Sequence, residues 1–252
     1  EVNCKMNGEY INITRKKMDF TTNEAYKALR TNIQFCGDDI KVILFTSCAP
    51  NEGKSIVSFN LCASFADDDK KVLFIDADLR KSVIIGRYKV GEVEKGLTHY
   101  LSGQCKLDEV IKHTNIDNMD IIFAGSYPPN PAELLNHARF GSMIEALRDK
   151  YDYIIVDTPP LGSVIDSAIV ARVCDGAIIV IEANSVSYRF AQYVKQQLEK
   201  TGCKILGVVL NKIPTDKNGY YGKYYGKYYG KYYGKYYGKY YGEYYGVNDG
   251  ES

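Results

Sequence analysis

Residues 41–55 read KVILFTSCAPNEGKS, and this stretch decides the fold. Its first half is a continuous run of apolar residues rich in β-branched side chains, a pattern typical of a strand buried on both faces. Its second half is a short polar loop that ends in Gly53-Lys54-Ser55, and residues 54–66 have the apolar spacing of a helix. The stretch therefore predicts a strand, a tight loop and a helix in immediate succession.

The same kind of apolar run recurs along the chain, and helical stretches lie between the runs. The further predicted strands are residues 71–76, 119–124, 153–157, 176–182 and 205–211, and the further predicted helices are residues 22–35, 131–150 and 188–201. Alternation of strands and helices predicts one α/β domain with a mainly parallel sheet and helices on both faces. We expect this domain to span residues 21–215, after an N-terminal extension of residues 1–20. For the helix over 22–35, Thr21 or Thr22 is the expected cap.

The composition changes abruptly in residues 216–252. The tetrapeptide YYGK occurs five times from Tyr220 to Lys239, and YYGE and YYG follow it. A glycine in every unit costs about 1 kcal/mol in a helix interior, and no Leu or Ile is present to build a core. We therefore expect a disordered tail. It contains fourteen of the 23 tyrosines, at positions Tyr220, Tyr221, Tyr224, Tyr225, Tyr228, Tyr229, Tyr232, Tyr233, Tyr236, Tyr237, Tyr240, Tyr241, Tyr244 and Tyr245.

Residues 48–55, CAPNEGKS, nearly match the phosphate-binding P-loop pattern GxxxxGK[ST] of nucleoside triphosphatases. In such a loop the backbone N–H groups surround the phosphates, and the helix N-terminus adds positive potential. Cys48 replaces the first glycine, and Asn51 stands where a second glycine is common; Asn tolerates left-handed backbone better than most residues. The predicted nucleotide contacts are Asn51, Glu52, Gly53, Lys54, Ser55 and Ile56.

Aspartates follow two of the other predicted strands. One strand ends in Asp76-Ala77-Asp78-Leu79-Arg80, and another ends in Asp157. The carboxyl ends of parallel strands meet at one edge of a sheet, where ligands bind. Carboxylates beside a phosphate site indicate Mg²⁺, for which the predicted ligands are Ser55, Asp76 and Asp157. The alternative is that each aspartate only caps a helix or a turn.

Charge and cysteine content exclude several classes of protein. Lys and Arg total 32 against 31 Asp and Glu, so no basic field indicates nucleic-acid binding. No apolar run approaches the roughly 20 residues of a membrane span, and residues 1–20 lack the apolar stretch of a signal peptide. The seven cysteines are scattered without a CxxC pair, which favours reduced thiols over a disulfide framework, a zinc site or a metal-cluster carrier.

Together these motifs resemble one known family. The P-loop form PxEGKS, the strand end DADLR and the strand IIVDTPP at residues 154–160 resemble the bacterial tyrosine kinases (BY-kinases) of capsule and exopolysaccharide synthesis. Residues 96–98 (GLT) and 128–135 (PPNPAELL) match the family as well. These kinases are cytosolic autokinases related to partitioning and cell-division-site ATPases.

The resemblance implies transfer of the γ-phosphoryl group of ATP to tyrosine, with Mg²⁺ as cofactor. Its implied catalytic residues are Lys54, Asp76, Asp78 and Asp157, with Asp78 at the phenol, and the tail tyrosines are the implied acceptors. Arg80 either contacts phosphate or stabilises its own strand end, and Asn211 either contacts adenine or is only a turn residue. The residues Glu24, Lys27 and Arg30 line one edge of the helix over 22–35 and resemble the family's oligomerisation motif ExxRxxR, with Lys27 in place of the first Arg. Their other interpretation is a solvated helix face.

The family likeness also suggests partners and a location. It implies a ring-like homo-oligomer, a separate transmembrane adaptor of the polysaccharide chain-length type and a cognate tyrosine phosphatase, but no nucleic acid. The expected location is the cytoplasm, with recruitment to the inner face of the membrane by the adaptor. The alternative function is a nucleotide-switched scaffold or positioning ATPase, although Ala49 occupies the loop position where those relatives usually carry an extra lysine.

Overall fold

The computed structural model describes residues 10–213, and all of their helices and strands belong to one unit that ends at Asn211. The fourteen tyrosines predicted as acceptors lie outside the described residues. The strands are β1 (Tyr10–Ile11), β2 (Val42–Ser47), β3 (Val72–Asp76), β4 (Ile111–Thr114), β5 (Met119–Ile122), β6 (Tyr153–Asp157), β7 (Gly176–Glu182) and β8 (Lys204–Asn211). The helices are α1 (Phe20–Gln34), α2 (Lys54–Ala66), α3 (Ile84–Arg87), α4 (Leu97–Leu101), α5 (Pro131–Asn136), α6 (Ala138–Arg148), α7 (Asp166–Ala171) and α8 (Tyr188–Glu199), with a 3₁₀ turn η1 (Leu107–Glu109).

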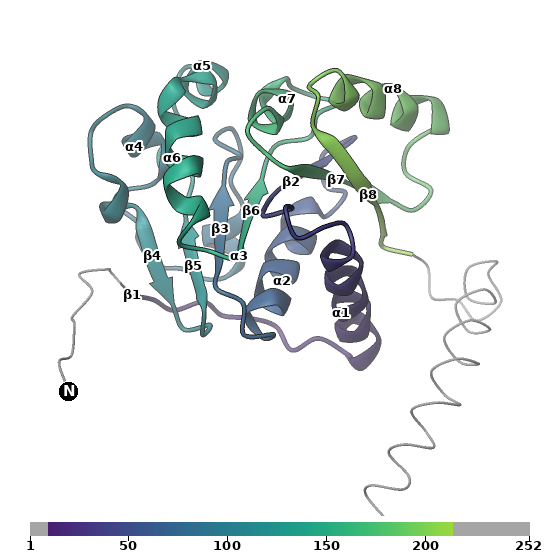
Figure 1. Cartoon of the computed structure of the whole chain (residues 1–252), viewed down its shortest axis with the longest axis horizontal. Coiled ribbons are helices and arrows are strands. Elements are labelled where there is room, and N and C mark those ends of the chain that lie inside the picture. Colours follow the sequence, from purple (N-terminus) through teal and green to yellow (C-terminus); the bar gives the residue numbers. More distant parts are fainter. Residues whose placement is uncertain (1–9, 214–252) are drawn as a thin grey trace, which may run out of the picture. The chain divides into compact units, whose positions relative to one another are not determined.

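The strands form a single sheet in the order β1-β4-β5-β3-β6-β2-β7-β8 (Figure 1). All neighbouring pairs are parallel except β4 and β5, which run antiparallel. This confirms the mainly parallel sheet expected from the sequence. The order places the carboxyl ends of β3, β6 and β2 side by side at the centre of the sheet, which brings the P-loop and both aspartate-bearing strand ends to the same edge.

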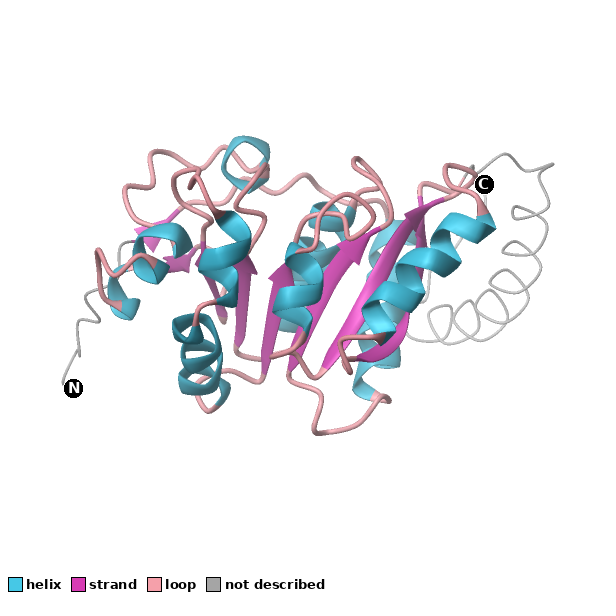
Figure 2. Cartoon of the chain, turned by 90° about the horizontal axis from the view of Figure 1, so that it is seen from above, coloured by secondary structure: helices cyan, strands magenta, loops and turns pink. Residues whose placement is uncertain are grey.

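Helices cover both faces of the sheet, as expected from strands that are apolar on both sides (Figure 2). Ile43 and Phe45 of β2 face a core layer built with α1, α2 and α3, whereas Val42 and Leu44 face a layer built with α4 to α8. Successive residues of a strand point to opposite faces, so a continuous apolar run supplies both layers at once. Within the described residues, no helix combines the length and the apolar character needed to cross a bilayer.

The single helix predicted over residues 131–150 is wrong, because the structure has two helices there. His137, between α5 and α6, has extended backbone with φ −67° and ψ 140°. Its ring Nδ1 accepts a hydrogen bond from the N–H of Arg139, so His137 caps the start of α6. A polar side chain that satisfies the free N–H groups of a new helix makes such a break favourable.

The start of the polypeptide's first helix also differs from the prediction. Helix α1 begins at Phe20, and its cap is Asp19, whose Oδ1 accepts from the N–H of Thr22 at 2.9 Å, not Thr21 or Thr22. Upstream of it, β1 pairs with β4, and the amide of Asn115 holds both the N–H and the carbonyl of the buried Ile13. Residues 10–13 of the expected N-terminal extension therefore pack on the sheet, through a strand too short to recognise in the sequence.

Candidate functional site

The P-loop between β2 and α2 has the backbone that the sequence predicts. Asn51 has φ 68° and Gly53 has φ 92°, both in the left-handed region, which confirms the expectation for Asn51. Glu52 is buried and ties the loop together: one carboxylate oxygen accepts from the N–H of Ala49 at 2.6 Å, and the other from the N–H of Glu182 at 3.3 Å. The loop is thus fixed in its curved form by its own acidic residue.

Asn211, the last residue of β8, contacts this loop from the side. Its Nδ2 donates to the carbonyl of Glu52 at 2.9 Å. A Cβ on Gly53 would lie only 2.2 Å from the same Nδ2, so glycine is required here by space as well as by φ. Asn211 therefore has a structural partner in the loop, and any contact with adenine would be made in addition to this one.

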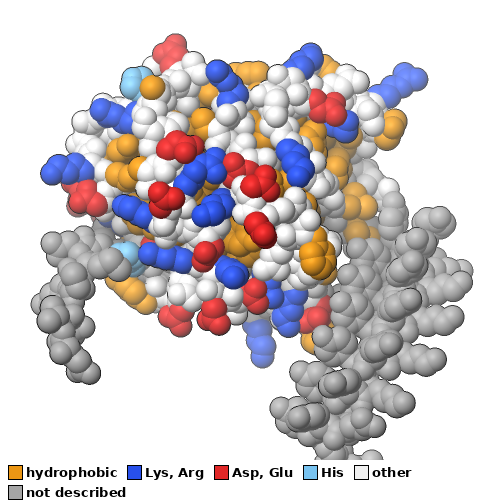
Figure 3. Space-filling view, viewed as in Figure 1, with side chains coloured by type: hydrophobic (Ala, Val, Ile, Leu, Met, Phe, Trp, Pro, Cys, Tyr) orange, Lys and Arg blue, Asp and Glu red, His pale blue; other side chains and the backbone are white. Residues whose placement is uncertain are grey.

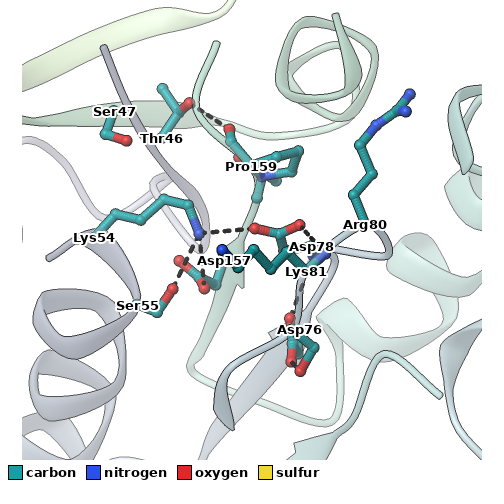
Figure 4. A network of polar contacts seen from close by, with 12 residues as sticks. Thr46, Ser47, Lys54, Ser55, Asp76, Asp78, Arg80, Lys81, Asp157 and Pro159 are labelled. Carbon is teal, nitrogen blue, oxygen red and sulfur yellow. Dashed lines mark hydrogen bonds and ion pairs between the residues drawn. The ribbon is translucent and has the colours of Figure 1, made fainter. Parts of the chain in front are cut away.

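Lys54 lies at the centre of the site, where three elements meet (Figure 4). Its Nζ is 3.3 Å from Asp78 Oδ2, 3.3 Å from Asp157 Oδ2 and 3.0 Å from Ser55 Oγ. The Lys54 side chain is only 9% exposed. Burial would lower the pKa of Lys54, but the charges of Asp157, Asp78 and Asp76 raise it above its ordinary value. The ammonium is therefore held charged in a place shielded from water.

Asp76 and Asp157 are partners in the register of β3 and β6, and both are buried. Burial, together with repulsion from Asp157, raises the pKa of Asp76 to about 7. Burial likewise raises the pKa of Asp157, against the charge of Lys54. Ser82 Oγ donates to Asp76 at 2.5 Å, and Ser58 Oγ donates to Asp157 at 3.1 Å. Two neighbouring carboxylates are thus oriented by hydroxyl groups and lack enough positive charge to neutralise both.

This set of donors fits a magnesium ion. Ser55 offers a hydroxyl, and Asp76 and Asp157 offer carboxylates whose mutual repulsion a divalent cation would relieve. Across residues 10–213 no three Asp, Glu, His or Cys side chains form a closed metal cage. Mg²⁺ commonly binds through one or two carboxylates while substrate phosphates and water complete its octahedron, so an open site suits it.

Arg80 lies apart from the Lys54 network. Its Nε and Nη2 donate to the two oxygens of Asp166 at 2.7 and 2.9 Å, and Figure 4 shows the side chain directed away from Lys54. Asp166 is fully buried at the start of α7. Arg80 thus ties the loop that carries Asp78 to α7. This contact favours the stabilising role for Arg80 over the phosphate-binding role, the two alternatives left open by the sequence.

Several supporting residues were missed by the sequence analysis. Ser167 of α7 and Thr46 of β2 both donate to the carbonyl of Pro159, and the N–H of Leu161 donates to Thr46 Oγ1. With Asp166, these contacts join the ends of β2, β3 and β6 through α7. Lone Ser, Thr and Asp residues carry no spacing signal, so only the fold reveals that they meet.

Comparison with known proteins agrees with this geometry. Residues 40–205 match a family described as "AAA domain". The chain is 47% identical over 216 residues to "Tyrosine-protein kinase CpsD" of Streptococcus pneumoniae, and the match covers 84% of this chain and 95% of the relative. The chain belongs to the bacterial tyrosine kinases. It is therefore a nucleotide-binding protein-tyrosine kinase of the non-receptor kind, in the family of capsule biosynthesis.

Solved structures place this kinase in the same group. The kinase domain of Escherichia coli tyrosine kinase ETK superposes with a TM-score of 0.74 at 33% identity, covering 84% of this chain and 92% of that domain. The chimerical protein CapA2B2 superposes with a TM-score of 0.73 at 29% identity, covering 81% of this chain and 93% of that one. The fold and the family expected from the residues alone are thus confirmed.

The predicted ionic row on α1 of this kinase is formed only in part. Lys27 Nζ pairs with Glu24 at 2.8 Å on the exposed side of the helix. Arg30 instead turns toward α2, where it donates to the carbonyl of Ser64 and pairs with Asp68 at 3.1 Å. Glu24 and Lys27 therefore share one surface, whereas Arg30 links α1 to α2.

Proposed function

We propose that this kinase is an ATP- and Mg²⁺-dependent autokinase that phosphorylates the tyrosine repeat of residues 220–245 in another copy of the chain, and so regulates capsular or exopolysaccharide polymerisation and export. The observation that carries the proposal is the contact of Lys54 Nζ with both Asp78 and Asp157 at 3.3 Å. This charged centre sits at the sheet edge beside the P-loop, in a chain that also contains fourteen clustered tyrosines.

The proposed roles follow from the chemistry of phosphoryl transfer. Its transition state is loose, so catalysis consists of positioning and charge neutralisation. The N–H groups of Gly53, Lys54 and Ser55 would hold the phosphates. The Lys54 ammonium would stay in contact with the γ-phosphoryl group during its transfer. Mg²⁺, when bound by Ser55, Asp76 and Asp157, supplies the remaining positive charge. Lys54 would then exchange part of its contact with the aspartates for contact with phosphate.

Asp78 is the proposed partner of the acceptor phenol. Its Oδ1 accepts from the N–H of Lys81 at 3.0 Å, so the carboxylate is oriented by the backbone of its own loop. A carboxylate is a weak base beside a phenol whose pKa is about 10. Asp78 would therefore orient the hydroxyl for attack, and the proton would leave late in the transfer.

Chain geometry favours transfer between copies. Tyr220 lies seven residues beyond Ile213, so it reaches at most about 25 Å from there at roughly 3.6 Å per residue. Asn211 contacts the P-loop of its own copy, so the tail begins beside the site and would have to turn back sharply for a proximal tyrosine to enter it. Distal tyrosines such as Tyr244 and Tyr245 have more freedom and leave transfer within one chain open.

Phosphorylation would also reverse the charge of the tail. Between Tyr220 and Gly246 five Lys oppose one Glu, which gives a net charge of +4. Each phosphotyrosine adds roughly −1.5 to −2, so about three modified residues reverse the sign. Accumulating phosphate would then drive the tails out of acidic sites and dissolve the oligomer. Equal sedimentation of a heavily phosphorylated chain and of a chain with Phe at every tail tyrosine would contradict this step.

A ring-like oligomer, with Glu24, Lys27 and Arg30 at its contact, belongs to the same proposal. So do a separate transmembrane adaptor that recruits the cytoplasmic kinase to the inner face of the membrane and a phosphatase that resets the tail. The CapA2B2 likeness is compatible with an adaptor, because that protein is a chimera. Co-sedimentation of the chain with vesicles that contain a candidate adaptor tests the recruitment.

Incubation with labelled ATP and Mg²⁺ tests the central step. Acid-stable, phosphatase-sensitive label on tail tyrosines, absent from the Lys54→Met variant and from a chain whose tail tyrosines are Phe, is the expected result. Hydrolysis of ATP without label on protein would overturn autophosphorylation and favour a positioning ATPase. A mixture of active tail-to-Phe enzyme with Lys54→Met substrate separates transfer between copies from transfer within one.

A further inference from the structure

The two edges of the sheet differ in how well they are protected against pairing with another strand. At one edge lies β1, which has two residues, and at the other lies β8, which has eight (Figure 1). Within residues 10–213, β7 is the only strand that pairs with β8. Proteins commonly protect an edge by keeping its strand short or by placing proline or charged side chains there. Strand β8 is long, lacks proline and has one charged residue, Lys204, at its start.

The carboxyl-terminal half of β8 presents both backbone and side chains at this edge. The carbonyl of Asn211 accepts from the N–H of Ala183 at 2.9 Å, so the backbone groups of Asn211 face β7. Because the direction of these groups alternates along a strand, those of Val209 also face β7, whereas those of Val208 and Leu210 point outward. The side chains of Val208 and Leu210 are 55% and 38% exposed. Two residues therefore offer outward N–H groups, outward carbonyls and apolar side chains together.

The two outward residues also share one face of the sheet. Val209 packs in the core layer built with α1, α2 and α3. Successive side chains of a strand point to opposite faces, so Val208 and Leu210 lie on the face that α8 covers. Helix α8 nevertheless leaves both of them exposed. An apolar strand laid along this edge would cover these side chains and bond the outward backbone groups.

We propose that β8 is a contact surface for a second copy of this chain, and that two β8 strands pair antiparallel about a two-fold axis through Val209. In this register Val208 of each copy lies opposite the partner's Leu210, and each such pair exchanges two backbone hydrogen bonds. The four apolar side chains meet on one face of the joined sheet, and the two Val209 side chains meet on the other. The same surface serves both copies, as a closed two-fold dimer requires.

Charge selects this register over the neighbouring ones that keep the same faces together. An axis through Val208 would bring Lys204 next to the partner's Lys212, and like charges opposite each other destabilise a strand pair. An axis through Leu210 would set the apolar side chain of Val208 against the partner's Lys212. The axis through Val209 places apolar side chains opposite apolar side chains throughout residues 208–210. This self-complementarity argues for a second copy as the occupant of the edge.

The proposed contact is independent of the proposed autokinase function. Antiparallel pairing places the carboxyl ends of the two sets of parallel strands at opposite edges of the joined sheet, so the two P-loops lie at opposite edges as well. The contact therefore does not set one active site against the other. It also differs from the α1 surface of Glu24 and Lys27, and it needs neither ATP nor phosphorylation.

Amide hydrogen exchange of the full-length chain without nucleotide tests the contact. Sedimentation should show reversible association that increases with concentration, as expected for a contact of modest area. Where association is nearly complete, the N–H groups of Val208 and Leu210 should exchange about tenfold more slowly than in the dilute chain. The N–H of Val209 faces β7 and should exchange slowly at both concentrations. Protection of Val208 and Leu210 that does not depend on concentration would overturn the proposal, because the cover would then come from the same chain. Rapid exchange of both at every concentration would overturn it too.

Two complementary variants of the full-length chain test both the partner and the register. Val208→Glu and Leu210→Lys each place a charge against an apolar residue of the partner, and each should weaken self-association about tenfold. Neither substitution changes a backbone group that faces β7. An equimolar mixture of the two should associate about tenfold more tightly than either variant alone. In the mixed dimer the new carboxylate lies opposite the new ammonium, and the remaining Leu210 lies opposite the partner's Val208.

Tyr10→Lys is the matched control, because Tyr10 belongs to β1 at the other edge of the sheet and is 67% exposed. This variant should associate as the natural chain does and should show the same protection of Val208 and Leu210. The proposal is overturned if the mixture of Val208→Glu and Leu210→Lys associates no better than either alone. It is also overturned if Tyr10→Lys weakens association as much as Leu210→Lys does.

Discussion

Lys54 and Lys27 both have a carboxylate partner, yet they belong to different physical regimes. Lys54 Nζ lies 3.3 Å from Asp157, and the two side chains are 9% and 1% exposed. Lys27 Nζ lies closer to its partner Glu24, at 2.8 Å, but the side chains are 50% and 21% exposed. Water and salt screen the exposed pair, whereas the buried pair keeps most of its interaction.

The shorter contact is therefore the weaker one, and burial rather than distance separates a reactive centre from a surface ion pair. The exposed charges in Figure 3 are interspersed in sign over the face shown, as is usual for a solvated surface. Charges buried at the sheet edge are stable only while they keep their ion-pair and hydrogen-bond partners. Five comparisons of variants test this contrast, from the largest expected effect to the smallest.

Lys54→Met should reduce phosphate transfer about a thousandfold, because a charge aimed at the transition state is lost from a site with little water. Initial rates with labelled ATP on a tail-bearing substrate chain measure the effect. Lys195→Met is the matched control, since Lys195 forms an exposed pair with Glu199 on α8 and should keep the natural rate. Comparable losses in both variants would refute the contrast between buried and exposed lysines.

Asp76→Asn should stabilise the protein at neutral pH when a chelator removes divalent cations. The folded pKa of Asp76 is about 7 against 3.8 for the ordinary group. Between these values the folded state binds the extra proton, so stability falls as pH rises from about 4 to 7. The gain from the substitution should be on the order of 4 kcal/mol at pH 7.5 and should vanish near pH 4. Urea unfolding across this range measures it.

The pKa of Asp175 is shifted in the opposite direction from that of Asp76, so its effect on stability has the opposite pH dependence. Burial would raise its pKa, but hydrogen bonds from Arg148 and from the N–H groups of Val42 and Lys41 lower it below the ordinary value. Its contribution is present above the unfolded pKa and is lost as pH falls through the folded one. Asp175→Asn should thus destabilise the protein at neutral pH and less so in acid. If the free energy of unfolding of Asp76→Asn and of Asp175→Asn changed with pH in the same way, the surroundings of the two carboxylates would not set their pKa values differently.

The Arg80–Asp166 pair should respond unequally to loss of either partner. Arg80→Met leaves the fully buried Asp166 without its countercharge and should cost about 2 kcal/mol or more of the free energy of unfolding. Asp166→Asn leaves an arginine that is 34% exposed and can turn to water, so it should cost less. Urea midpoints at pH 7 compare the two, and equal losses would argue against burial as the deciding factor.

Lys27→Met should change the free energy of unfolding by less than about 0.5 kcal/mol, as is usual for an exposed pair. Arg30→Met should cost about 1 kcal/mol, because Arg30 donates to the carbonyl of Ser64 in α2. Urea unfolding measures both. A larger cost for Lys27 than for Arg30 would reverse the roles that we assign along α1.

Much of this architecture was predictable because its signals are local. The unbroken apolar runs predicted strands buried on both faces, and the P-loop with Asn51 in left-handed backbone follows from residues 48–55 alone. The break at His137 was not predictable, since it depends on a side chain capping the next helix. The two-residue β1 is too short for periodicity to reveal, and it exists only because β4 offers an edge to pair with.

By itself the sequence determined the α/β class, the phosphate loop, the aspartates at the strand ends and the family. Those features depend on residue types at fixed short spacing, and such local patterns can be recognised without knowing the tertiary structure. Only the tertiary structure decided that Lys54 sits between Asp78 and Asp157, that Arg80 turns to Asp166 and that Arg30 leaves the ionic row for α2. Partners that lie 24 to 103 residues apart around Lys54 are selected by strand order and burial, and neither is written in local spacing.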